Sequence, residues 1–238
     1  MRDLPAKLLL VRRRVLALVG SLLLVATGCA RPSPTRSERS PAGSEAGHAE
    51  REWVSLFDGE SLDGWRASEH PETFSVEDGK IVVDGPRAHL FYVGPVQNHD
   101  FDDFAFKADV MTRPRANSGI YFHTQYQEGG WPAAGYEVQV NNSYDEDPRR
   151  TASLYAVDDV RRTPIPDGEW FSIYIRVNGD RIVVKANGET MVEYTEPENP
   201  QRPSDMAGRV LSSGTFALQA HDSESTVYYK NIRVRPLD

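Results

Sequence analysis

Residues 119–155 constrain the fold of this chain most, because they contain three short runs in which apolar and polar residues alternate. Successive side chains of a β-strand point to opposite faces of the sheet, so an alternating run predicts a strand with one face buried. The apolar positions of the three runs are Ile120 and Phe122, Val138 and Val140, and Leu154 and Ala156. We therefore expect three strands that contribute these side chains to a hydrophobic core.

The other parity of the same runs is rich in polar and aromatic side chains. Its members are Tyr121, His123 and Gln125, then Glu137, Gln139 and Asn141, and finally Ser153 and Tyr155. One interpretation of such a face is plain solvated surface. Aromatic rings, however, stack on sugar faces, while amides and carboxylates hydrogen-bond sugar hydroxyls. The combination therefore favours a carbohydrate site.

Short strands separated by turn residues fill most of the chain after residue 52. Asp78-Gly79 predicts a hairpin turn, and Asn178-Gly179 and Asn187-Gly188 predict two more, of type I′. The other expected strands are residues 89–93, 101–111, 170–177, 181–186, 190–194, 214–222 and 226–237. No segment shows a convincing helical period. The sequence therefore predicts an all-β sandwich or jelly roll of antiparallel sheets.

The N-terminus has the features of an export signal. A basic Arg12-Arg13-Arg14 segment precedes an apolar run that is shorter than the roughly 20 residues of a membrane-spanning helix. Residues 25–29 (VATGC) resemble a bacterial lipobox, in which the cysteine is lipidated. The alternative is an ordinary secretory signal with an unrelated cysteine. Because Cys29 is the sole cysteine and lies at the cleavage point, we expect an exported protein anchored to a bacterial membrane by acyl chains at Cys29.

This signal also sets the predicted domain boundaries. Residues 1–28 form the signal peptide, residues 29–51 the lipidated cysteine and a disordered tether, and residues 52–238 the folded domain. With one cysteine, no disulfide can form within the chain. The formal charge of −8 becomes −12 once the five basic residues and one acid of residues 1–28 are removed, which argues against a nucleic-acid partner.

A further strand adds to the polar face. Gln219 and His221 share one parity of residues 216–221, and they join Glu137 if the strands are neighbours. The concave face of a curved sandwich then forms a groove for an extended sugar. Within it, Glu137 or His221 could act as general acid or base, and Asp222 follows the histidine directly.

Each candidate also has a purely structural interpretation. Glu137 could be a surface carboxylate, and His123 or His221 a histidine that bonds a loop. His89 begins a strand and either borders the groove or is structural. The acidic run Asp145-Glu146-Asp147 could hold a hard cation such as Ca²⁺, although such runs are more often solvated turns. The sequence contains no pattern typical of metalloproteases, serine hydrolases or P-loop enzymes.

Several motifs resemble those of the 3-keto-disaccharide hydrolase family. They are LFDGESLDGW, NSGIYFHT, GYEVQV, EWFSIYIRVNGDRIVVKANG and GTFALQAHD, in the family's order over residues 52–238. The resemblance implies a concanavalin A-like jelly roll that acts on glycosides oxidised at C3 of the sugar. The family's GYExQ motif falls on residues 135–139 and its LQxH motif on residues 218–221. The chain departs from the family at residues 86–89 and at Asp222, and either change could alter the substrate preference or the contacts at the end of the groove.

A ketone at C3 acidifies the proton on C2, and removal of that proton lets the glycosidic oxygen leave C1. We expect Glu137 or His221 to be the base, and His123 and Gln139, or a divalent cation, to stabilise the enolate. The expected substrate-binding residues are Tyr121, Gln139, Asn141, Tyr155, Gln219, His89 and Asp222. A lectin-like module that binds glycans without cleaving them is the main alternative. A conventional β-glucanase is disfavoured, because no strand carries an ExDxE-type set of carboxylates.

Overall fold

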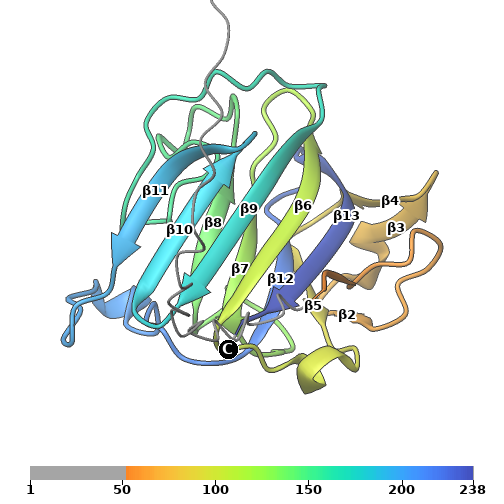
Figure 1. Ribbon diagram of the computed structural model, residues 1–238. Helices are drawn as coiled ribbons and strands as arrows, with labels where there is room; N and C mark the ends of the chain where they lie inside the picture. The colour runs from red at the N-terminus through yellow and green to blue at the C-terminus, as the bar shows by residue number, and fades with distance from the viewer. Residues whose placement is uncertain (1–51, 238) are drawn as a thin grey trace, which may run out of the picture. The chain divides into compact units, whose positions relative to one another are not determined.

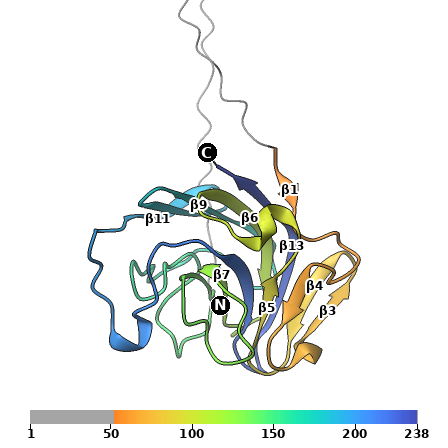
Figure 2. The same cartoon turned by 90° about the horizontal axis from the view of Figure 1, so that it is seen from below.

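The computed structural model describes residues 52–237, which form two antiparallel β-sheets packed face to face (Figure 1). The predicted signal peptide, Cys29 and the tether lie outside the described residues. Figure 2 shows the two sheets as separate layers, with β6 and β9 in one and β5 and β7 in the other. Within residues 52–237, no helix has the length and apolar character needed to cross a membrane.

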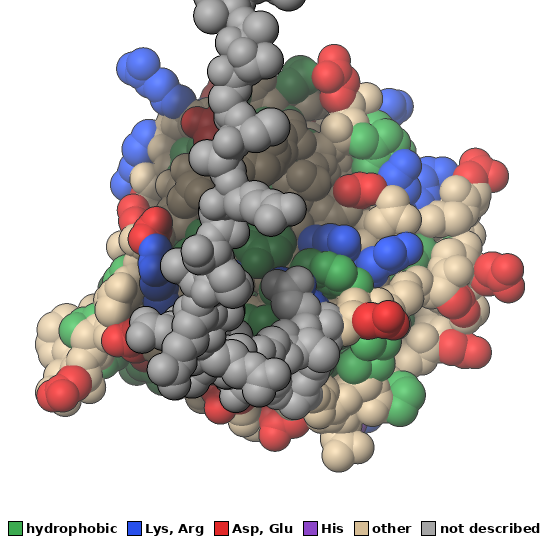
Figure 3. Space-filling model, in the orientation of Figure 1, with side chains coloured by type: hydrophobic (Ala, Val, Ile, Leu, Met, Phe, Trp, Pro, Cys, Tyr) green, Lys and Arg blue, Asp and Glu red, His purple; other side chains and the backbone are tan. Residues whose placement is uncertain are grey.

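The larger sheet has eight strands. They are β1 (Val54–Ser55), β3 (Phe74–Glu77), β4 (Lys80–Asp84), β6 (Phe104–Thr112), β9 (Phe171–Asn178), β10 (Arg181–Ala186), β11 (Glu189–Thr195) and β13 (Thr226–Pro236). Their order is β11-β10-β9-β6-β13-β4-β3, and β1 pairs with β13. On the face shown in Figure 3, acidic and basic side chains are interspersed rather than gathered by sign.

The smaller sheet has five strands and carries the polar parity identified in the sequence. They are β2 (Trp65–Ala67), β5 (Ala88–Tyr92), β7 (Ser118–Thr124), β8 (Tyr136–Val140) and β12 (Thr215–Ala220). Their order is β2-β5-β12-β7-β8. Three short 3-10 turns, η1 (Pro71–Thr73), η2 (Val96–His99) and η3 (Ser204–Met206), lie in the connections.

The core lies between the sheets and is built from the predicted apolar parities. Phe104 and Phe106 of β6 pack against Phe216 of β12, with ring centroids 4.9 and 4.7 Å apart. Phe122 of β7 meets Phe104 at 5.7 Å, and Ile120 is fully buried beside them. Because these side chains occupy one face of the smaller sheet, its opposite parity is free to form a site.

Two of the three predicted hairpins have the expected turns. Asp78-Gly79 and Asn187-Gly188 adopt positive φ at both positions, as a type I′ turn requires. The third prediction was wrong in detail. β9 and β10 pair Asn178 with Arg181, so the two-residue loop is residues 179–180, and only its glycine has a positive φ. That arrangement fits a type II′ turn, in which glycine takes the first central position.

The third alternating run is not a regular strand. Leu154 forms only isolated bridges, to Val138 and to Asp158. Backbone hydrogen bonds from the amides of Tyr155 and Ala152 to the carbonyls of Glu137 and Gln139 still hold this segment against β8. Residues 152–155 therefore border the smaller sheet beyond β8, which keeps Tyr155 next to the site.

Candidate functional site

The polar face is assembled by the register of three strands. Tyr121 on β7 pairs with Glu137 on β8 and with Ala217 on β12. Two residues along β7, Gly119 pairs with Gln139 on β8, and the neighbouring Ser118 hydroxyl donates a hydrogen bond to the carbonyl of Gln219 on β12. Side chains from three distant parts of the chain therefore meet on one face, as the alternation predicted.

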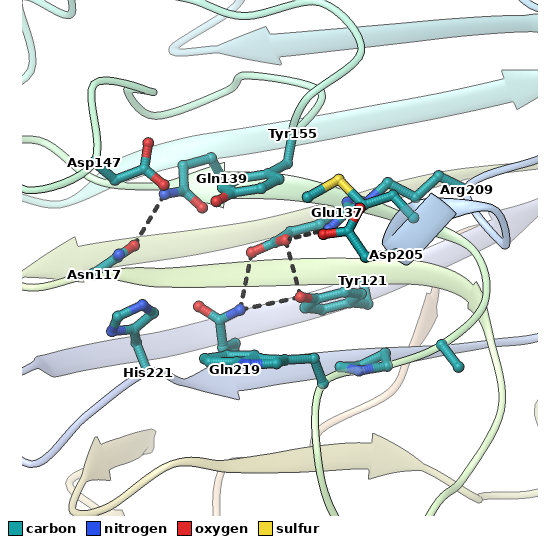
Figure 4. A pocket seen from close by; sticks show the side chains of 14 residues that line it. Asn117, Tyr121, Glu137, Gln139, Asp147, Tyr155, Asp205, Arg209, Gln219 and His221 are labelled. Carbon is teal, nitrogen blue, oxygen red and sulfur yellow. Dashed lines mark hydrogen bonds and ion pairs between the residues drawn. The ribbon is translucent and has the colours of Figure 1, made fainter. Parts of the chain in front are cut away.

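These side chains surround a pocket of about 350 Å³ (Figure 4). Its lining consists of Asn117, Tyr121, Trp131, Pro132, Ala133, Glu137, Gln139, Asp147, Tyr155, Asp205, Met206, Arg209, Gln219 and His221. The pocket therefore contains three carboxylates (Glu137, Asp147 and Asp205), an imidazole, a guanidinium, amides and aromatic rings, which is the chemistry expected of a sugar site.

Glu137 is the most strongly held group of the pocket. It is 3% exposed, and its Oε2 accepts hydrogen bonds from the Tyr121 hydroxyl at 2.9 Å and from Arg209 Nη2 at 3.2 Å. Its Oε1 accepts a bond from Gln219 Nε2 at 2.9 Å. With its nitrogen facing Glu137, the Gln139 amide lies 3.3 Å from the same oxygen. The carboxylate thus organises four neighbouring side chains.

Burial raises the pKa of Glu137 above its usual value, and Arg209, Tyr121 and Gln219 offset part of that rise. Tyr121 shows the same effect, because burial and then the nearby Glu137 charge raise the pKa of its phenol well above the ordinary value. Removing a proton from Tyr121 is therefore unfavourable, and its hydroxyl is a hydrogen-bond donor to the carboxylate.

The Glu137 carboxylate leans into the space that Gly119 leaves on β7. A Cβ at Gly119 would lie 2.5 Å from Glu137 Oε1 and 2.9 Å from its Cγ. Contacts below 3.0 Å to Cβ force a neighbour to move. Glycine is therefore required here for close approach rather than for backbone conformation.

His221 forms the second reactive group of the pocket. Its Nδ1 lies 2.6 Å from Asp222 Oδ2. Nε2 is therefore the ring nitrogen that Asp222 does not contact. Trp131 and Tyr144 flank the ring at 5.4 and 5.6 Å. Partial burial raises the pKa of Asp222, but hydrogen bonds from His221 and from the Glu224 backbone amide outweigh it, and the pKa is below its ordinary value. An ionised Asp222 fixes the orientation of the imidazole.

The sequence analysis did not identify Arg209, which lies in the connection between β11 and β12. The loop brings Arg209 over the Tyr155 ring, 4.9 Å from its centroid, and into contact with Glu137. Its Nη1 is buried and has no hydrogen-bond partner. No local pattern marks a loop arginine that reaches 72 residues back along the chain to its partner.

Tyr155 lies where the sequence analysis expected it, in the pocket wall. Its ring is held between Arg149 at 4.4 Å and Arg209 at 4.9 Å. Burial, followed by its hydrogen bond to Asp147, raises the pKa of Tyr155 to about 12. The hydroxyl therefore remains protonated in the neutral pH range.

The structure places His123 away from this pocket, so the expectation that it shares a face with Tyr121 is wrong. A bulge shifts the β12–β7 register near Thr215, and His123 adopts a φ of 56°. Its ring packs on Phe104, and its Nε2 donates to the Asp102 carbonyl at 2.8 Å. Burial lowers the pKa of His123, and its imidazole is structural.

Asn141 also has a structural role. Its Nδ2 donates to the carbonyls of Tyr144, Asp147 and Arg149 at 2.8–3.1 Å, so it shapes the loop that follows β8. It does not line the pocket. The prediction that Asn141 binds substrate is therefore not supported by its position.

His89 contacts two residues of the pocket wall but does not line the pocket itself. It pairs with Gln219 across β5 and β12, is fully buried, and contacts the rings of Tyr121 and Trp131 at 5.4 and 5.6 Å. Both of its ring nitrogens lack a hydrogen-bond partner. Burial lowers the pKa of His89 to about 3, so the ring is neutral. It supports Trp131 rather than lining the pocket.

The acidic run after β8 faces arginines. Asp145 pairs with Arg150 at 2.8 Å, and Glu146 pairs with Arg115 at 2.6 Å. Asp147 lies 3.4 Å from Arg149. Among residues 52–237, no group of three or more His, Cys, Asp or Glu side chains is arranged to hold a metal ion. The donor set expected for Ca²⁺ is thus divided among three ion pairs.

Comparison with known families decides the classification. A family model described as a 3-keto-alpha-glucoside-1,2-lyase-like domain matches residues 52–235. The chain belongs to this family. The match spans both sheets and the whole pocket, and it confirms the resemblance found in the sequence motifs. No curated protein sequence matched the chain.

Solved structures confirm the jelly-roll fold of this family member. A protein from Parabacteroides distasonis named as a candidate glycosyl hydrolase is 24% identical, with a TM-score of 0.65, over 78% of this chain and 94% of that one. The carbohydrate-binding module CBM66 from Bacillus subtilis is 14% identical, with a TM-score of 0.52, over 72% and 95%. SCLam, a family GH16 endo-beta-1,3(4)-glucanase, is 15% identical with a TM-score of 0.52, over 78% and 91%.

Proposed function

We propose that this domain cleaves 3-keto-glycosides by elimination, with His221 as the base that removes the C2 proton. The observation that carries the proposal is the His221–Asp222 pair at 2.6 Å, whose histidine lines the same pocket as Glu137 and Arg209. A carboxylate that orients one ring nitrogen of a histidine leaves the other to accept a proton. The family match supports a keto-sugar as the substrate class.

The proposed reaction breaks two bonds and needs no oxidant. His221 Nε2 takes the proton from C2, and the electron pair of that bond forms an enolate with the C3 carbonyl. The enolate then forms a C1=C2 double bond and expels the glycosidic oxygen, which leaves as an alcohol after taking up one proton. Addition of water across that double bond gives the free keto-sugar and makes the net reaction a hydrolysis.

Arg209 suits the stabilisation of the enolate. Its guanidinium lines the pocket, is held by Glu137 and Tyr155, and has a buried Nη1 without a protein partner. A preorganised cation in a buried site stabilises developing negative charge more strongly than the same cation in water. The side-chain oxygen of Gln219 is likewise buried and unpartnered, so it can accept a hydrogen bond from a sugar hydroxyl.

Glu137 acts as the positioning group in this proposal. Both of its oxygens accept hydrogen bonds from the protein, and those bonds fix Arg209, Tyr121 and Gln219 in one arrangement. His221 is 29% exposed at its side chain, whereas Glu137 is 4% exposed. We therefore assign proton transfer to the histidine, which a substrate in the pocket reaches more easily.

The test compares a 3-keto-glucoside with the unoxidised glucoside. We expect the full chain to cleave only the keto form, because only a C3 ketone acidifies C2. His221→Gln should lower kcat by about 100-fold or more, and Glu137→Gln should lower kcat/KM through the loss of Arg209 positioning. Glu224→Gln, an exposed acid close to Asp222, is the control and should retain activity.

Two results would contradict the proposal. One is cleavage of the unoxidised glucoside at the same rate, which would indicate a conventional glycosidase. The other is binding of both sugars with no turnover of either, which would indicate a lectin-like module.

A further inference from the structure

Two adjacent rows of side chains on the outer face of the larger sheet are mainly basic, although the face as a whole carries charges of both signs (Figure 3). Each row crosses β13, β6, β9 and β10 in register. The first row consists of Arg233, Lys107, Tyr174 and Lys185, and the second of Arg235, Ala105, Arg176 and Val183. Between the rows, Phe106, Ile175 and Val184 are buried in the core, so both rows point away from it.

The cations of these rows lack acidic partners. Among residues 52–237, no carboxylate lies within ion-pair distance of four of them, namely Lys107, Arg176, Lys185 and Arg233. The acid that continues the second row, Glu193 on β11, is paired with Arg181. One row away, Asp109 accepts a hydrogen bond from Asn231 at 2.6 Å. Because residues 29–238 carry a formal charge of −12, a group of cations without counter-charges points to an anionic partner.

Aromatic rings lie among these cations. The Trp53 and Tyr174 rings contact each other, with centroids 6.4 Å apart. Lys107 Nζ lies 4.1 Å from the centroid of the Trp53 ring, and Lys185 Nζ lies 5.9 Å from that of Tyr174. Tryptophan and tyrosine combine an apolar ring with a polar tip, and they are enriched where a membrane meets water. The combination of cations and such rings therefore favours a lipid surface over a purely polar anion.

The N-terminal part of the chain joins the domain at this face. Trp53 lies over the basic rows, and β1 follows it directly and pairs with Arg233 and Val234 of β13. The 22 residues between Cys29 and Glu52 span at most roughly 80 Å. The acyl anchor predicted at Cys29 would keep the face within that distance of a bilayer. Docking then becomes an intramolecular step, for which weak contacts suffice.

We propose that the outer face of the larger sheet docks on a membrane surface of anionic phospholipids. The lipid phosphates contact the two basic rows, and Trp53 and Tyr174 lie at the level of the headgroups. Because the sheets pack face to face, the pocket of Glu137 and His221 lies on the opposite side of the domain and stays open to the aqueous phase. The proposal extends the predicted anchor at Cys29 and is independent of the reaction proposed for the pocket.

Fluorescence quenching tests the docking in the full chain. The chain is added to vesicles of phosphatidylcholine, with or without phosphatidylglycerol, that carry a quencher on the lipid headgroup. A fluorophore at Thr190→Cys reports on the first row, because Thr190 pairs with Lys185. We expect about threefold more quenching on the anionic vesicles, and about 0.5 M NaCl should remove this difference by screening the charges.

Two controls fix the position of the label. The same fluorophore at Glu128→Cys, in the loop that carries Trp131, should be quenched little on either kind of vesicle. The parent chain, whose sole cysteine is Cys29, gives the background from any label at that position.

Charge reversal identifies the cations involved. Arg176→Glu combined with Arg233→Glu, at two exposed positions, should abolish the difference between the vesicles. Arg161→Glu combined with Arg162→Glu changes the net charge equally, in an exposed loop, and should preserve the difference. The salt dependence of the parent, which needs no charge reversal, keeps the test decisive if a variant fails to fold.

Equal quenching at Thr190→Cys on both kinds of vesicle, or a difference that survives the reversal of Arg176 and Arg233, would overturn the proposal. Binding of soluble polygalacturonate by the parent and not by that variant, without any effect of vesicle charge, would assign the rows to an acidic glycan and would also overturn it. Flotation with neutral vesicles reports on the anchor alone. A chain that floats only with anionic vesicles would refute the anchor and uphold the docking.

Discussion

His221 and Asp222 show how adjacent residues can form a catalytic pair at the end of a strand. β12 ends at Ala220, so strand geometry no longer forces the side chains of the next two residues to point to opposite faces of the sheet. The ring and the carboxylate can therefore meet at 2.6 Å. In the proposed mechanism, Asp222 holds the His221 tautomer whose Nε2 faces the substrate.

Asp222→Asn tests this positioning role. An amide can present its NH₂ to Nδ1 and so favour the wrong tautomer, while the pocket keeps its shape. We expect kcat on a 3-keto-glucoside to fall about 10- to 100-fold with little change in KM. The dependence of kcat on pH should also change. Asp222→Glu should recover part of the rate. An unchanged kcat and pH profile in Asp222→Asn would show that His221 acts without this partner.

His89 predicts how stability depends on pH. Its pKa is about 3 in the folded chain, because burial and then the charges of Arg87 and His221 lower it more than Glu69 raises it. In the unfolded chain an ordinary histidine has a pKa near 6.5. The unfolded state therefore binds an extra proton between these values. The stability linked to His89 is fully present above about pH 6.5 and is lost as the pH falls, by roughly 2 kcal/mol at pH 5.

The corresponding experiment is urea denaturation between pH 7.5 and 5. His89→Leu should remove roughly 2 kcal/mol of the decrease in unfolding free energy seen for the parent over this range. His70→Gln, which removes an exposed histidine, is the matched control for the loss of an imidazole. Identical pH slopes for the parent and His89→Leu would mean that His89 is not buried as the structure has it.

At the level of the strands, the smaller sheet depends on close packing between β7 and β8. Gly119 leaves the space that the Glu137 carboxylate occupies, so the two residues form one unit across the pair. This relation is not visible in the sequence, where Gly119 only precedes the alternating run that starts at Ile120.

A double-mutant cycle measures this coupling. Gly119→Ala should destabilise the domain by roughly 1–3 kcal/mol, because the new Cβ displaces Glu137 or the strand. In a Glu137→Ala background the same change should lower the free energy of unfolding by at least about 1 kcal/mol less. This difference is the coupling energy expected for two residues in contact. Urea denaturation of the four chains gives the coupling energy. Strictly additive effects would show that Gly119 does not make room for the carboxylate.

The strands also show where sequence analysis succeeds and where it cannot. Period-two alternation predicted β7, β8 and β12 and their polar face, because the side-chain period is local and fixed. It placed Glu137, Gln219 and His221 in one site. It failed for His123, because a bulge and one positive φ reverse the side-chain direction without any change in residue pattern. Arg209 was missed, because a loop contact depends on the assembled sheet.

Over residues 52–237, two packed sheets support the face that carries the pocket of Glu137 and His221. The family match and the solved structures confirm the jelly roll that many short strands predicted. Export and lipidation at Cys29 stay predictions from the sequence, because they concern residues outside 52–237. The central proposal is that the first pocket removes a proton from C2 of a 3-keto-sugar.

Hydrogen exchange at C2 tests that proposal most directly. The full chain is incubated with a 3-keto-glucoside in D₂O, and the released sugar is followed by NMR and mass spectrometry. We predict that C2 loses its original hydrogen, so that the product is either unsaturated at C1–C2 or carries solvent deuterium at C2, and that His221→Gln abolishes both. A released keto-sugar that keeps its original C2 hydrogen would contradict elimination and indicate direct hydrolysis.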